Sequence, residues 1–379
     1  MGFFVSGAGM AYAQSELVPD QSTLMKARVL NIEKEETKEI PGTDTKTTFQ
    51  TIKVQILDGA EKGKEVTIDN DYLNLEKGEV FYLTHTVSSL DDVEYYTVND
   101  PYRLPQVLFL VGLFVVAVCI FGGKQGMRGL ASLVGSFALI FFVLLPGIMH
   151  GYSPLLVTVG VSSLIIVLGS YVTHGFTRAT SSAVLGMIAT VSVTGLLAYW
   201  SVHFTRLSGF GSEEAVYLNL NSRGSIDILG LLLGGIIIGL LGVLYDAAIG
   251  QAVSVEELTK IAPHVSRKRI YQRALRIGRE HIGALVNTLA IAYVGASLPL
   301  LLLFYKTSSG GIAQIANTEI FSTEIVRIMI GSIGLVLAVP ITTLVSVVML
   351  VKKPAQAADS LEISKENEAL KHAGHSHKH

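Results

Sequence analysis

Residues 104–123 read LPQVLFLVGLFVVAVCIFGG, a run without a single charged side chain. At 1.5 Å of rise per residue, a helix of this length is about 30 Å long, which is the thickness of the hydrocarbon core of a bilayer. A strand crosses that distance with about half as many residues, and exposed backbone polar groups are not tolerated in lipid. The run therefore predicts a transmembrane helix.

Six further apolar runs of similar length follow it. They cover residues 130–149, 154–172, 182–200, 226–245, 282–305 and 328–351. Half of the 379 residues are hydrophobic, 16% are charged and the mean hydropathy is +0.49. This composition excludes a single soluble domain of ordinary usage. Residues 104–353 are therefore predicted to form a membrane α-helical bundle of about seven transmembrane helices.

The polar N-terminal part predicts a small β domain over residues 16–103. Apolar and polar residues alternate in it, as in TIKVQI at 51–56. Turn sequences such as Asp58-Gly59 and Lys77-Gly78 separate five expected strands. These strands are expected at 26–32, 49–57, 65–69, 79–87 and 93–98. Five short strands fit either an OB-like barrel or a simple curled sheet, and both alternatives stay open.

The two ends of the chain have signals of their own. Residues 1–15 contain Ala11-Tyr12-Ala13, a small-residue pattern typical of the end of a secretory signal, and the alternative is an ordinary terminus. The tail, 354–379, is rich in histidine. Its candidate metal ligands are His372, His375, His377 and His379. Four imidazoles bind a transition metal loosely when no structure holds them, so a solvated tail is the preferred interpretation.

Lys and Arg fall unequally on the two sets of loops that these spans create. One set carries Lys124, Arg128, Arg178, Lys260, Arg267, Lys268, Arg269, Arg273, Arg276, Arg279, Lys352 and Lys353. The other set, the N-terminal domain apart, carries Arg206, Arg223, Lys306 and Arg327. The positive-inside bias makes the first set cytoplasmic. We therefore expect the β domain to be exported and the C-terminus to lie in the cytoplasm.

Segment 255–281 is basic and amphipathic. Ile270, Ala274 and Ile277 share one half of a helical wheel, and most cations occupy the other half. This pattern is typical of a helix lying on the bilayer, with anionic lipids as its partner. The candidate lipid-binding residues are Arg267, Lys268, Arg269, Arg273, Arg276 and Arg279. A location between two membrane spans favours lipid over nucleic acid.

The run 226–245 carries glycines at helical spacing, and these predict close helix packing. The packing candidates are Gly230, Gly234, Gly235, Gly239 and Gly242. Asp246 follows on the same face as the last three. If the span continues to Val255, Asp246 lies about 13 Å deep in the membrane. The alternative interpretation ends the span at Tyr245 and leaves Asp246 hydrated at the interface.

A carboxylate inside a membrane faces protein or water, which makes Asp246 a candidate for ion or proton coupling. Asn287 and Thr288, in the following span, are expected at a similar depth of about 10 Å. We therefore expect Asp246 to face the interior of the bundle, against Asn287. Hydrogen bonding between helices is the alternative role for Asn287 and Thr288.

Two stretches carry a family resemblance. They read GVLYDAAIGQ at 242–251 and GREHIGALVNTLAIAYVGASLPL at 278–300. With these stretches the chain resembles the YibE/F family of bacterial multi-pass membrane proteins. The resemblance implies a bacterial cell membrane and an exported domain joined to a multi-span region. It implies no activity for any residue.

Three functional hypotheses remain. The first is a transport-related protein, coupled to ions or protons through Asp246. The second is a non-transporting scaffold whose exported β domain binds an envelope protein. The third is a membrane enzyme acting on lipid-linked substrates, which a cluster of His203, Glu213 and Glu214 around an outer cleft would favour. The sequence does not align these three residues as acid and base, and the alternative is that they belong to a hydrated connecting loop. No nucleotide-binding loop, zinc-protease motif or serine elbow is present, and no cofactor is predicted.

Overall fold

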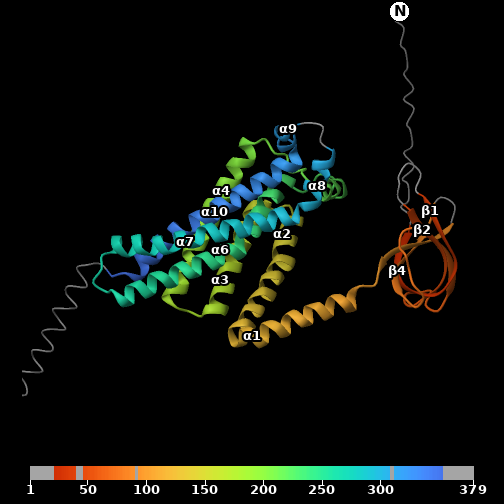
Figure 1. Cartoon of the computed structure of the whole chain (residues 1–379), viewed down its shortest axis with the longest axis horizontal. Helices are drawn as coiled ribbons and strands as arrows, with labels where there is room; N and C mark the ends of the chain where they lie inside the picture. Colours follow the sequence, from red (N-terminus) through yellow and green to blue (C-terminus); the bar gives the residue numbers. More distant parts are fainter. Residues whose placement is uncertain (1–20, 40–45, 90–92, 308–310, 353–379) are drawn as a thin grey trace, which may run out of the picture. The chain divides into compact units, whose positions relative to one another are not determined.

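The computed structural model describes residues 21–39, 46–89, 93–307 and 311–352. The chain divides into two compact units, Met1–Val116 and Ala117–His379 (Figure 1). The expected signal segment and the histidine-rich tail lie outside the described residues.

The first unit is built on one antiparallel sheet. Its strands are β1 (Gln21–Glu39), β2 (Lys46–Ile56), β3 (Glu65–Asn70), β4 (Val80–Val87) and β5 (Glu94–Pro101), in the order β3-β2-β1-β4-β5. All five expected strands are confirmed. The first is longer than predicted because its second half also pairs with β2, as far as Glu39 opposite Lys46. No ladder joins β3 to β5 among the described strands, so the unit is a curled sheet.

Strand alternation gives this sheet its own core. Ile52, Val54 and Ile56 of β2 are buried, and they pack with Phe81 and Leu83 of β4. Side chains between them point away from this core because the strand period is two. A single apolar face, rolled around itself, therefore holds the unit together.

After β5 the described chain is helical, and its first helix is α1. The elements are α1 (Leu104–Leu139), a π-helical turn (Ile140–Leu144), α2 (Leu145–Met149), α3 (Pro154–His174), α4 (Arg178–Phe204), α5 (Glu213–Asn221), α6 (Ile228–Ile261), α7 (Arg267–Ala296), α8 (Leu298–Thr307), α9 (Ile312–Ala316) and α10 (Glu319–Leu350). The described residues hold five helices long and apolar enough to cross a membrane, or six if α7 and α8, bent by 62°, form one span. These helices, buried against each other only in part, are those of a membrane protein. The expected number of seven is not confirmed.

The first candidate span is too long to cross a bilayer once. It covers Leu104–Met149, 46 residues, which as a straight helix would be about 69 Å long. At Gly123 the backbone leaves the helical region, with φ 52° and ψ −139°. A positive φ is readily adopted by glycine, which has no Cβ. The break falls where the first expected run ends.

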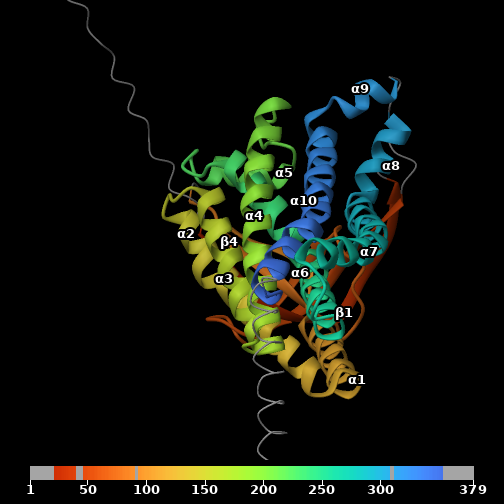
Figure 2. The same cartoon turned by 90° about the vertical axis from the view of Figure 1, so that its left-hand side faces the viewer.

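Small residues bring α4 and α10 together, and α10 lies between α4 and α7 (Figure 2). A Cβ at Gly186 of α4 would lie 2.8 Å from the Cα of Thr342 on α10. In the reverse sense, a Cβ at Gly334 of α10 would lie 2.6 Å from Thr194 Oγ1 on α4. Such close approach is typical of helices in membranes. The sequence analysis did not single out this interface.

Three of the five candidate packing glycines of α6 face a neighbouring helix, and two do not. A Cβ at Gly234 would lie 2.6 Å from Thr158 Oγ1 of α3, and Gly230 also faces α3 at Pro154. Gly239 faces Tyr293 of α7. Around Gly235 and Gly242, by contrast, there is open space. The structure therefore does not join Gly235, Gly239 and Gly242 into one packed face, because α3 and α7 approach α6 from other directions.

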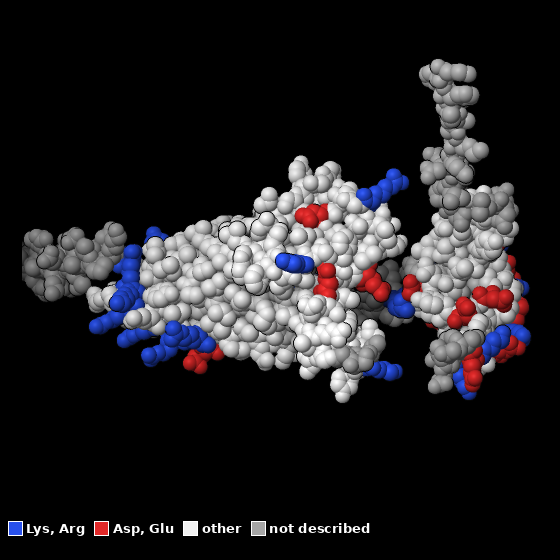
Figure 3. All heavy atoms as spheres, turned by 90° about the horizontal axis from the view of Figure 1, so that it is seen from above, with Lys and Arg blue, Asp and Glu red and all other residues white. Residues whose placement is uncertain are grey.

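The basic segment 255–281 is not a separate surface helix. Its first part ends α6, and its second part begins α7, which continues to Ala296. Ile270 and Ala274 are buried against Val255 and Val347. Protein therefore covers part of the apolar face that we expected on lipid. Lys and Arg side chains gather at this end of the helical unit, where α6 ends and α7 begins (Figure 3).

Candidate functional site

The first candidate pocket has Asp246 in its wall, and we call it the Asp246 pocket. It has a volume of about 250 Å³ and lies between α6, α7 and α10. Its lining residues are Asp246, Ala247, Gly250, Gln251, Ser254, Gly278, His281, Leu285 and Val339. Gln251 is buried and donates a hydrogen bond to the Ala274 carbonyl at 2.7 Å, so its amide holds α6 to α7. Asp246 and His281 are the ionisable groups at the wall.

The structure does not bring Asp246 and Asn287 together. Asp246 is exposed at the wall of its pocket and does not point into the bundle interior. Asn287 and Thr288 lie on the exposed face of α7, where the Thr288 hydroxyl donates to the Ala284 carbonyl at 2.9 Å. The residues of α7 that line the pocket with Asp246 are Gly278, His281 and Leu285, of which His281 is ionisable. Depth along a helix does not fix which side of α7 faces α6.

A second pocket, which we call the Arg327 pocket, lies further along α6 and α10. It has a volume of about 320 Å³. Its lining residues are Gly209, Gly211, Ser212, Glu214, Ala215, Ile228, Leu231, Leu232, Gly235, Thr323, Glu324 and Arg327. Arg327 was expected in a loop, and this expectation is wrong. Because α10 begins at Glu319, Arg327 lies about 12 Å inside the helix.

An ion pair forms the wall of this second pocket. Arg327 Nη1 donates to Glu324 Oε1 at 2.7 Å, and Glu324 Oε2 accepts from the Ser297 hydroxyl at 3.2 Å. Ser297 is the residue at which the chain bends between α7 and α8. Charged residues within membrane helices are costly and mark functional sites, and interrupted helices line binding sites in transporters.

Several polar atoms near this ion pair are buried without a hydrogen bond. They are Tyr293 Oη, Thr323 Oγ1 and Arg327 Nε, counted within the part of the chain that the structure describes. A buried polar group without a partner costs free energy, so such groups concentrate where a ligand or water binds. Thr323 lines the pocket itself, with 4% of its surface exposed.

An apolar layer lies between the two pockets, and we call it the Leu335 cluster. Ala247, Leu289 and Leu335 are buried in it, and Val243, Leu285, Val286 and Tyr293 pack around them. From Arg327 to Val339, one residue of each pocket on α10, the rise is about 18 Å. From Gly235 to Asp246 on α6 it is about 16 Å. The same two helices thus line both pockets and the apolar layer between them.

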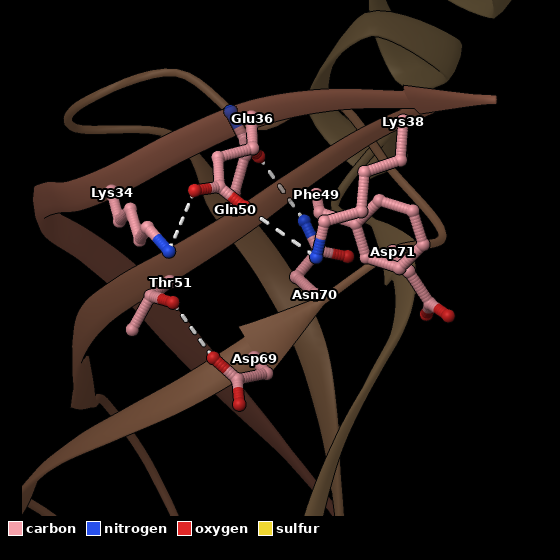
Figure 4. Close-up of a pocket in the computed structure, with 9 residues that line it drawn as sticks. All are labelled: Lys34, Glu36, Lys38, Phe49, Gln50, Thr51, Asp69, Asn70 and Asp71. Carbon is pink, nitrogen blue, oxygen red and sulfur yellow. Dashed lines mark hydrogen bonds and ion pairs between the residues drawn. The ribbon is translucent and has the colours of Figure 1, made fainter. Parts of the chain in front are cut away.

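The β unit has a separate cavity of about 570 Å³ (Figure 4). It is formed by the second half of β1, the first half of β2 and the end of β3. Its lining residues are Lys34, Glu36, Lys38, Phe49, Gln50, Thr51, Asp69, Asn70 and Asp71. Lys38 Nζ lies 4.7 Å from the centre of the Phe49 ring, and Lys34 pairs with Glu36 at 2.7 Å. Charges of both signs beside an aromatic ring suit a polar or peptide partner.

The structure gives no support to an acid and base pair in the loop after α4. His203 Nδ1 lies 2.8 Å from the Tyr199 carbonyl, while Glu213 and Glu214 begin α5. No contact between the histidine and these carboxylates occurs in the described ranges. Main-chain and Ser212 hydrogen bonds hold the pKa of Glu214 below its usual value, which keeps it an anion and makes it a poor proton donor.

Comparison with known proteins agrees with the helical architecture. The sequence profile of the YibE/F-like proteins matches residues 110–352, which contain most of α1 and every later helix of the described chain. No curated protein and no solved structure matches the chain. Because the profile covers more than half of the sequence, including 242–251 and 278–300, the chain belongs to the YibE/F-like family.

Proposed function

We propose that the helical unit transports ions or small polar solutes along a path between α6, α7 and α10. The observation that carries this proposal is the arrangement of two pockets with charged side chains in their walls, both lined by α6 and α10, with the apolar Leu335 cluster between them. A transporter needs polar sites that are reached from one side at a time and a barrier that closes the path. Apolar constrictions close such paths by excluding water.

The charged groups of the two pockets have different roles in this proposal. Asp246 couples transport to a proton or cation, because it is an exposed carboxylate on a pocket wall within a membrane helix. Glu324 and Arg327 orient the solute beside the bend at Ser297. Tyr293, whose hydroxyl fills the space at Gly239, moves with α7 and adjusts the barrier.

We propose a topology with seven spans. Counting Leu104–Met149 as two spans divided at Gly123, and α7 with α8 as one span, raises the five candidates by two, to seven. The Lys and Arg distribution then places the Asp246 pocket toward the cytoplasm of a bacterial cell. In this arrangement the β unit and the Arg327 pocket are on the outer side, and the C-terminus is inside.

Thiol labelling tests the path directly. In a Cys119→Ser background, Gly235→Cys and Gly250→Cys each place one thiol in a pocket, and both sites have open space for a side chain. A membrane-impermeant maleimide should label the first thiol in intact cells and the second in inside-out vesicles. Gly283→Cys, on the exposed face of α7, is the control for labelling outside the path. Labelling of both pocket thiols from one side would contradict the proposal.

The scaffold hypothesis has one observation in its favour, the charged cavity of the β unit. In that alternative an envelope protein binds the cavity and the helices only anchor it. Lys38→Glu reverses the charge beside Phe49 and should weaken that binding. The thiol-labelling pattern should be the same with and without this substitution if transport is the function of the helices.

A further inference from the structure

A cluster of metal-ligand side chains lies on the β unit, away from its cavity. Glu61 belongs to the turn between β2 and β3, His85 to β4 and Glu94 to β5. One ligand atom from each lies within 4.8 Å of the other two. His85 Nε2 is 3.4 Å from Glu94 Oε2, and His85 Nδ1 is 3.9 Å from Glu61 Oε2. The turn before β3, strand β4 and strand β5 thus each bring one ligand side chain to the same place on the sheet.

His85 offers a nitrogen that the protein leaves without a hydrogen bond. Its side chain is 13% exposed, and Nε2 is buried with no hydrogen-bond partner among the described residues. The ring stacks on Tyr96, with ring centres 4.6 Å apart and planes 8° apart. Stacking fixes the direction of the ring nitrogens. An imidazole held beside two carboxylates has the composition of a site for a divalent transition metal.

Tyr96 also holds the carboxylates in place. Its hydroxyl donates to Glu61 Oε2 at 2.8 Å and lies 3.4 Å from Glu94 Oε2. Groups that orient metal ligands in this way change metal affinity by about 10- to 100-fold when they are removed. Tyr96 therefore acts as a positioning residue for both acids.

The Lys64 ammonium pairs with both carboxylates of the cluster. It lies 2.7 Å from Glu61 Oε1 and 3.8 Å from Glu94 Oε2. The Lys64 side chain is 43% exposed, so it moves away without opening the core.

We propose that Glu61, His85 and Glu94 bind a divalent transition-metal ion of the Zn²⁺ class, which competes with Lys64 for the two carboxylates. Two ligands of a tetrahedral zinc with bonds of about 2.1 Å lie about 3.4 Å apart, and His85 and Glu94 already have this separation. Water completes the coordination. The ion ties the turn before β3 to β5, the two edges of the sheet that no ladder joins.

Calorimetric titration with ZnCl₂ tests the proposal on the full-length protein. His372, His375, His377 and His379 are replaced by Ala, so that the tail binds no metal. One zinc ion should bind per chain, and Co²⁺ should give the visible absorption of a low-symmetry site. Glu94→Gln and His85→Gln should each weaken binding by about tenfold or more.

Lys64→Gln provides the opposite and decisive result. It removes the competing ammonium and should tighten zinc binding, which a merely unfolded variant cannot do. The matched control is Lys53→Gln, since Lys53 pairs with Glu65 at 2.8 Å, is equally exposed and lies outside the cluster. Absence of zinc binding in the protein without tail histidines would overturn the proposal. Binding that ignores both Glu94→Gln and Lys64→Gln would overturn it as well.

Discussion

Arg267 donates two hydrogen bonds to the main-chain carbonyl of Val351, from Nε at 2.9 Å and from Nη2 at 2.7 Å. Nη2 also donates to the Val348 carbonyl at 3.1 Å. α10 ends at Leu350, so these carbonyls belong to the helix terminus, where no intrahelical donor is left. A cation there is also favoured by the helix dipole. Arg267 thus ties the start of α7 to the end of α10.

Loss of this tie should destabilise the helical unit. Arg267→Gln removes charged hydrogen bonds and should lower the free energy of unfolding by about 1.5–3 kcal/mol. Thermal unfolding in detergent measures the change. Arg269→Gln is the control, because Arg269 is exposed and forms no ion pair with any residue that the structure describes. Equal effects of the two substitutions would show that the hydrogen bonds to α10 contribute nothing.

The remaining cations are the better candidates for anionic lipid. They are Lys268, Arg269, Arg273, Arg276 and Arg279, all exposed. Each cation near an anionic surface contributes about 1 kcal/mol, so replacing Arg273, Arg276 and Arg279 by Gln should weaken binding of a 266–281 peptide to anionic vesicles about a hundredfold. Vesicle sedimentation at two salt concentrations checks this. Binding that is indifferent to salt would remove the electrostatic explanation.

Close packing of α4 on α10 gives a prediction that does not depend on any function. Gly186→Ala places a methyl group 2.8 Å from the Cα of Thr342, a backbone atom that cannot move away freely. Overpacking of this kind should cost about 1–3 kcal/mol of stability, measured by unfolding in detergent. Gly250→Ala, where the space is open, should be neutral or stabilising. Equal stability of the two variants would be inconsistent with the interface described above.

The local sequence pattern was sufficient to predict the elements that follow from the spacing of apolar residues and from the length of apolar runs. Alternation in 51–56 predicted β2, and apolar runs predicted the membrane helices. The helix breaks at Gly123, where the first expected run, 104–123, ends. The length of an apolar run therefore showed where a helix crosses the bilayer. Closure of the β unit was left open, since strand order depends on long-range pairing, as in Ala27 opposite both Ile56 and Phe81.

The candidate site was harder to predict because side-chain direction is set by tertiary packing. Asn287 lies on the exposed face of α7, while His281 lines the pocket with Asp246. Arg327 was assigned to a loop because a charged residue lowers the hydropathy that defines a span. A helical pattern with Glu324 three residues earlier is the signal that would have found it.

Asp246→Asn should stop coupled transport. The substitution keeps the shape of the side chain in the Asp246 pocket and removes its charge, so protein amount and insertion should be unchanged. Reconstituted vesicles containing a pH-sensitive dye, under an imposed potassium diffusion potential, measure the proton flux. Ser254→Ala is the matched control, because Ser254 lines the same pocket but already donates to the Gly250 carbonyl at 2.8 Å. A fully active Asn variant would remove Asp246 from the mechanism.

The Leu335 cluster should act as the barrier between the two pockets. Leu335 and Leu289 are 1% and 4% exposed. Truncating both to Ala opens a cavity between the Asp246 pocket and the Arg327 pocket. Water should then join the pockets, and the vesicles should leak ions without a driving solute.

The control for this leak is Leu240→Ala. Leu240, on α6, is 1% exposed like Leu335, but it belongs to the cluster that α3, α4 and α6 form with Ala338 of α10. Each of these Leu→Ala changes should cost about 2–5 kcal/mol of stability, so destabilisation alone predicts leaks in both proteins. A path through the Leu335 cluster predicts a leak only in the first. Ion flux that is equal in the two variants, or absent from both, would exclude the cluster as the gate.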